Sequence, residues 1–171
     1  MYLNELLLGY KLGRFIFSIS FLISYFLYIS ITKINFLNFP LTILIIYSLT
    51  SFILIVYREI NIFEFLLDII FITVFIISSF QSIYYLSLLY LFPIFFYGVL
   101  SGKKLTYSLA IASLLLYIFI RFTFAQDELY DLILPSFLHG FSFFIISFAS
   151  ISLNKRLKKQ EEEIQKLEEE R

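Results

Sequence analysis

Long apolar runs separated by short polar segments dominate the pattern along this 171-residue chain. Each run extends for about 18 residues or more, enough for a helix to cross a hydrocarbon core about 30 Å thick. The pattern predicts an all-α, polytopic membrane protein of about six transmembrane helices over residues 1–153. The expected spans are about 15–32, 38–57, 62–79, 83–100, 105–124 and 132–153.

The segments at the ends of these runs indicate where spans begin and turn. Met1–Tyr10 is short and apolar and contains Glu5, so we expect it to lie at the membrane interface. Pro40 falls in the first turn of the second span, where proline is tolerated. The polar hairpin Ser78–Ser82 reverses the chain between the third and fourth spans, and Pro93 is expected to kink the fourth.

The orientation follows from the positions of the Lys and Arg residues. With the N-terminus inside, all of the 13 basic residues except Lys33 and Arg121 fall on the cytoplasmic side. The opposite orientation reverses this bias and contradicts the positive-inside rule. We therefore expect a multi-pass protein of a bacterial inner membrane with its N-terminus and C-terminus both in the cytoplasm.

Residues 154–171, after the last apolar run, form a highly charged tail with the sequence NKRLKKQEEEIQKLEEER. Spacings of 4, 3, 4 and 3 place a heptad seam at Leu153, Leu157, Gln160, Ile164 and Leu167. The pattern predicts a cytoplasmic coiled-coil linker and a homodimer formed through the sixth span and this coil. The alternative is a solvated helical tail whose charges only stop translocation. The coil is too short to hold a dimer alone. This favours the interpretation that it is the first part of a signalling linker.

Two segments together carry a resemblance to a known family. They are residues 66–117, LLDIIFITVFIISSFQSIYYLSLLYLFPIFFYGVLSGKKLTYSLAIASLLLY, and the tail RLKKQEEEIQKLEEER. The chain resembles the membrane sensor module of PilS-type and related sensor histidine kinases. In that family six tightly connected spans lead through a coiled-coil linker, often with a PAS domain, to the kinase core. The resemblance implies a signal-transmitting module of a two-component system whose partners are downstream PAS or kinase domains, absent from this sequence.

Three residues inside the predicted spans could carry function. Asp68 and Glu64 lie one turn apart in the third span, and a charged side chain there costs a few kcal/mol on insertion. They form either an intramembrane polar site that latches helices together, or a pair of interfacial acids bonded to serines or to Lys103; the second is favoured for Glu64. His139 is the one histidine, and packing is favoured over sensing. We expect no Asp68–His139 proton pair, because the two lie near opposite faces.

Composition excludes several function classes. The chain is 60% hydrophobic and 15% charged with zero net charge, so no basic face for nucleic acid is indicated. It has no cysteine, which excludes disulfides and thiolate metal sites. With no phosphate-binding loop or catalytic triad, we expect no enzyme activity, cofactor or metal in this chain. The alternative function is a small structural or scaffold membrane protein, of the cell-shape or division type, whose tail docks a cytoplasmic partner.

Overall fold

The computed structural model describes residues 2–33, 35, 38–78, 86–124 and 128–171, which form helices and contain no β-strand. The elements are α1 (Tyr2–Thr32), α2 (Phe39–Leu54), α3 (Ile62–Ser78), the 3₁₀ turn η2 (Ser87–Tyr90), α5 (Leu91–Ser101), α6 (Thr106–Thr123) and α7 (Leu129–Glu169). The predicted all-α class is confirmed. By length and composition, α1, α6 and α7 are each able to cross a membrane, which indicates a membrane protein.

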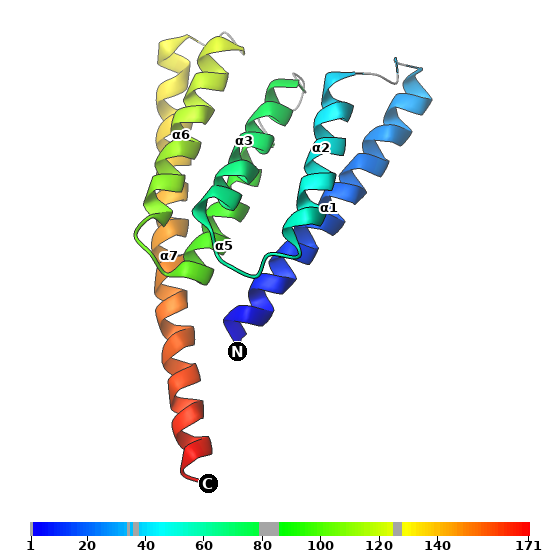
Figure 1. Ribbon diagram of the computed structural model, residues 1–171. Helices are drawn as coiled ribbons and strands as arrows, with labels where there is room; N and C mark the ends of the chain where they lie inside the picture. The colour runs from blue at the N-terminus through cyan, green and yellow to red at the C-terminus, as the bar shows by residue number, and fades with distance from the viewer. Residues whose placement is uncertain (1, 34, 36–37, 79–85, 125–127) are drawn as a thin grey trace.

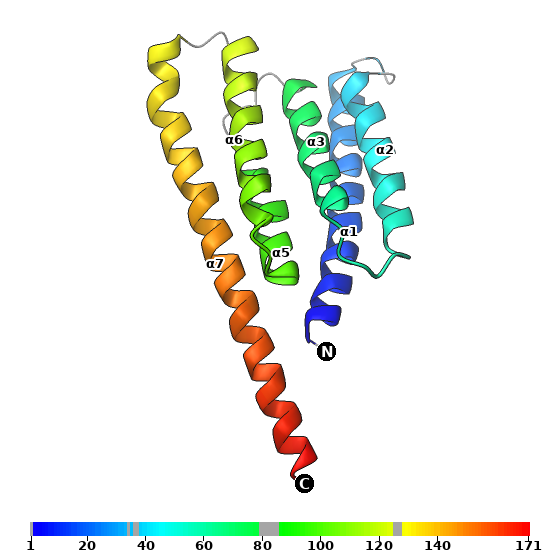
Figure 2. The same cartoon turned by 60° about the vertical axis from the view of Figure 1, so that its left-hand side comes forward.

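Consecutive helices run in opposite directions, so the chain passes up and down an elongated bundle (Figure 1). The two termini lie at the same end of this bundle in both views (Figures 1 and 2). The C-terminal half of α7, drawn in orange and red, continues alone beyond the other helices. A single helix therefore joins the body of the molecule to the charged tail.

The first helix begins much earlier than the apolar pattern suggested. α1 is continuous from Tyr2 to Thr32, so residues 2–10 of the segment expected at the interface are the first part of a 31-residue helix. The basic residues taken to precede the span, Lys11 and Arg14, are buried at 1% and 5% exposure. They have partners on α2 and α3, and these contacts hold the early turns against the bundle.

The second helix has a capped start and ends early. The Asn38 side chain accepts a hydrogen bond from the Leu41 N–H at 3.0 Å, and Pro40 lies in the first turn as expected. α2 ends at Leu54, three residues before the expected boundary. The carbonyls of Leu54 and Tyr57 at this end accept hydrogen bonds from Lys11 Nζ, and the Leu54 carbonyl also accepts one from the Tyr57 N–H at 3.3 Å.

The fourth pass combines two kinds of helix. The 3₁₀ turn η2 leads directly into α5, and Pro93 is the third residue of α5. The change of helix type, between Tyr90 and Leu91, lies within one turn of Pro93, which lacks the N–H that an α-helical bond would use. The polar hairpin that precedes this pass lies, beyond Ser78, outside the described residues.

In the bundle, α7 packs on α5 and α6, α1 packs on α2, and α3 contacts α2, η2, α5 and α6. Its core is apolar and aromatic and includes Phe65, Ile69, Tyr90, Ile94, Leu109 and Phe143. Large apolar side chains also cover the outside of the helices; Tyr130 is 82% and Phe137 70% exposed. A surface of this kind is unsuited to water and suited to lipid.

Helices α5 and α7 approach each other closely at Gly98 and Gly102. A Cβ on Gly98 would lie 2.7 Å from Ser150 Cβ, and one on Gly102 would lie 2.6 Å from Asn154 Cγ. Gly102 also has φ of +62° and ends α5 in the left-handed conformation. Asn154 is 2% exposed and donates from Nδ2 to the Val99 carbonyl at 2.5 Å. This contact fixes α7 to the bundle at the point where the charged tail begins.

Candidate functional site: a buried charge network joining three helices

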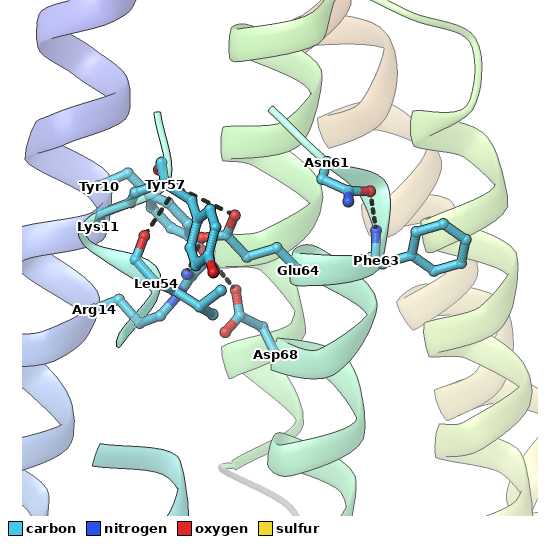
Figure 3. Close-up of polar contacts among 9 residues, drawn as sticks. All are labelled: Tyr10, Lys11, Arg14, Leu54, Tyr57, Asn61, Phe63, Glu64 and Asp68. Atoms are coloured by element: carbon cyan, nitrogen blue, oxygen red, sulfur yellow. Dashed lines mark hydrogen bonds and ion pairs between the residues drawn. The ribbon is translucent and has the colours of Figure 1, made fainter. Parts of the chain in front are cut away.

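Arg14 of α1 pairs with both acidic residues of α3. Its Nη1 contacts Glu64 Oε1, and its Nη2 lies 2.7 Å from Asp68 Oδ2 (Figure 3). The three side chains are between 2% and 5% exposed. Glu64 and Asp68 are four residues apart and so lie on one face of α3, which allows a single guanidinium to bridge them. The start of α3 is fixed by Asn61, whose Oδ1 accepts a hydrogen bond from the Phe63 N–H at 3.1 Å.

Lys11 extends the network to α2. Its Nζ lies 3.4 Å from Glu64 Oε2 and donates hydrogen bonds to the carbonyls of Leu54, at 3.1 Å, and Tyr57. Figure 3 shows these contacts converging between α1 and the start of α3. A cation at this position adds a hydrogen bond to carbonyls at and just beyond the C-terminus of α2 and interacts favourably with the helix dipole. Lys11 therefore binds α1 to both neighbouring helices.

Two tyrosines complete the hydrogen bonding of Asp68. Tyr10 of α1 donates to Oδ2 at 2.7 Å, and Tyr47 of α2 donates to Oδ1 at 2.9 Å. The Tyr10 ring also lies beneath the guanidinium of Arg14, 4.6 Å from its central carbon. Asp68 of α3 therefore accepts hydrogen bonds from Tyr10 and Arg14 of α1 and from Tyr47 of α2.

The network contains equal numbers of positive and negative groups. Lys11 and Arg14 balance Glu64 and Asp68, so the cluster is neutral overall. Pairing and hydrogen bonding offset the large cost of removing such charges from water, whereas loss of one partner leaves an uncompensated charge. These polar contacts depend on one another and hold α1, α2 and α3 together. We call the group the latch; its members are Tyr10, Lys11, Arg14, Tyr47, Glu64 and Asp68.

The structure gives both acids of α3 partners on a neighbouring helix. The partners that the structure gives Asp68 lie on α1 and α2, and those of Glu64, Lys11 and Arg14, lie on α1. The expectation of an interfacial acid at Glu64 stays a prediction, with Lys11 and Arg14 as the partners that the structure shows. A functional role for the latch stays a prediction.

Sequence reasoning missed Lys11 and Arg14 as members of the site. They were counted only as topology signals, although they are three residues apart and share a face of α1. Two bases on one helix and two acids on another, each set near the same end of the bundle, were a readable signal of pairing. Tyr10 and Tyr47 gave no such signal among 13 tyrosines.

His139 lies in a separate part of the bundle. Its ring stacks on Tyr117 with centroids 3.9 Å apart, Nε2 lies 3.1 Å from Ser87 Oγ, and Nδ1 lies 2.8 Å from the Pro135 carbonyl. The observed partners of Asp68 do not include His139. Packing between η2, α6 and α7 accounts for these contacts, and a sensing role stays a prediction. In the described ranges of the chain, no three His, Cys, Asp or Glu side chains are grouped as metal ligands.

The predicted seam lies on a continuous helix with its apolar positions available. Leu153 is 37%, Ile164 40% and Leu167 63% exposed; Gln160 is exposed and Leu157 half-buried. All of them belong to α7, which runs without interruption to Glu169. A partner for the seam stays a prediction.

Comparison of the chain with protein-family models, curated proteins and solved structures found no match.

Proposed function

We propose that the chain is a membrane sensory module that passes a change in its helix bundle to cytoplasmic domains through α7. The observation that carries the proposal is the continuity of α7 from Leu129 in the bundle to Glu169 in the charged tail. At 1.5 Å per residue, its 41 residues span about 60 Å. A rigid helix that is fixed to the bundle at Asn154 and exposed beyond it transmits a tilt or rotation along its length.

The proposed output is that of a two-component histidine kinase, with the kinase and any PAS domain supplied beyond this module. The exposed apolar seam supports a homodimer, because a heptad stripe with no partner in a single copy is completed by the same stripe of a second copy. The proposed dimer is weak because like charges meet across it: Glu163 at position g would face Glu168 at position e of a parallel partner. Repulsion of this kind makes a coil easy to switch.

Single cysteines along the tail test the homodimer. The parent chain has no cysteine, so each variant carries one thiol. In native membranes, Leu157→Cys, Ile164→Cys and Leu167→Cys should form disulfide-linked dimers under mild oxidation. Lys158→Cys and Glu162→Cys lie away from the seam and should link poorly, as measured on non-reducing gels. Equal linkage around the helix would favour the alternative of a scaffold protein with a solvated tail.

The proposal includes six membrane passes in a bacterial inner membrane with both ends in the cytoplasm. The shared end of the two termini and the distribution of Lys and Arg support it.

A membrane-impermeant thiol reagent tests this topology. Glu128→Cys, at the start of α7, should react in intact cells. Lys104→Cys and Gln160→Cys, both exposed, should react only after the inner membrane is permeabilised. Lys104 is a better site than Gly102, where a side chain would overlap Asn154. Labelling of Lys104→Cys from outside would contradict the six-pass arrangement.

A further inference from the structure

A lateral cleft of about 460 Å³ opens between α1, α3 and the η2–α5 pass. Its walls are mostly apolar and aromatic and include Leu6, Phe17, Ile72, Phe92 and Phe96. The side chains of Tyr10, Arg14, Tyr47 and Asp68 also line it. The cleft therefore combines a long apolar surface with one polar region, and its volume falls in the range of small-molecule sites, about 300–1,000 Å³.

Two glycines of α1 keep the cleft open. Gly9 and Gly13 line it, and a Cβ built on either would meet no atom within 4 Å. Glycines spaced in this way usually let a second helix approach closely. In the described residues no helix does so here, and the space above both glycines stays accessible from the side of the bundle. Larger residues at these positions would narrow it.

Arg14, one of the polar residues that line the cleft, carries a donor without a hydrogen-bond partner among the described residues. Arg14 uses Nη1 and Nη2 on the two acids of α3, while its buried Nε has no hydrogen-bond acceptor in the part of the chain that the structure describes. A buried, unsatisfied N–H costs free energy that an acceptor oxygen would recover. Because the surrounding charges are balanced, the region offers no net charge to attract an ionic group.

We propose that the cleft binds an uncharged single-chain amphiphile from the bilayer. Its acyl chain lies along the apolar walls over Gly9 and Gly13, and a carbonyl or hydroxyl oxygen of its head accepts a hydrogen bond from Arg14 Nε. An occupant at this site contacts the latch directly and changes how the side chains of α1 and α3 pack together. The proposal does not depend on the signalling function.

The test uses the full chain in phosphatidylcholine nanodiscs and a monoacylglycerol that carries a photoreactive diazirine in its acyl chain. We expect labelling that saturates, that excess plain monoacylglycerol removes, and that maps to cleft residues such as Phe92 and Phe96. Gly13→Leu should lower the saturable labelling about tenfold. This is the effect expected if the bound acyl chain loses the burial of roughly two methylene groups. Gly13→Ala should lower it less.

Ser24→Leu is the matched control. It adds the same side chain to the exposed side of α1, about 16 Å along the helix and outside the cleft. Labelling should be unchanged in this variant, and circular dichroism should show equal helix content in all. Even labelling of all lipid-facing residues, or full labelling of Gly13→Leu, would overturn the proposal. If Gly13→Leu and Ser24→Leu lower the labelling equally and both abolish a dimer, this face of α1 binds a second copy of the chain. That result would also overturn the proposal.

Discussion

Replacing Arg14 with glutamine should lower the free energy of unfolding by about 3–5 kcal/mol, the usual cost of removing one member of a buried charge network. The change leaves Glu64 and Asp68 with one cation between them, Lys11, which contacts only Glu64. The guanidinium is also lost from the Tyr10 ring. The measurement is unfolding in mild detergent with increasing SDS, followed by helical circular dichroism.

Arg58→Gln is the control for this experiment. Arg58 is an exposed arginine that follows α2, and surface substitutions of this kind change stability by about 0.5 kcal/mol or less. Arg14→Gln combined with Asp68→Asn should be less unstable than the sum of the single variants, because each change removes a charge that the other leaves unpaired. If Arg14→Gln and Arg58→Gln unfold alike, the latch does not stabilise the bundle.

The apolar pattern was sufficient to predict the helices but not all their ends. Each of the six predicted runs contains a helix, because only a helix satisfies the backbone of a long apolar segment internally. α1 begins at Tyr2, ahead of the span expected from residue 15, and it includes Lys11 and Arg14, which the apolar pattern places at the polar end of a span. A hydropathy pattern shows only that a residue is charged. Whether a charged side chain is buried depends on whether a neighbouring helix supplies the opposite charge, as α3 does for Lys11 and Arg14.

Asp68 and Glu64 were identifiable as unusual residues, since charged groups in an apolar run demand a partner. Which residues satisfy them depends on helix order and rotation, which the sequence pattern does not fix. The same holds for small residues. Ser20 and Ser24, four residues apart on α1, are exposed, whereas Gly98 and Gly102, four residues apart at the end of α5, form the close contact with α7. A small residue permits a contact, and the position of the opposite helix decides whether one forms.

A single inserted residue in α7 should change signalling output by about fivefold or more, within the range of typical coupling between sites. The insertion is placed between Lys155 and Arg156, one residue beyond Asn154, so the contacts of Ser150 and Asn154 with α5 stay intact. One residue turns everything beyond it by about 100°. The seam positions Leu157, Ile164 and Leu167 then face away from their partners in a second copy.

The most direct test of the account is therefore an insertion series with a histidine kinase core fused after Arg171, in which autophosphorylation is measured in membranes. Insertions of one and three residues should alter the activity. An insertion of seven should largely restore it, because it returns the seam to within about 20° of its original face. Activity that is unchanged by any insertion, or that follows tail length without regard to phase, would contradict transmission through α7.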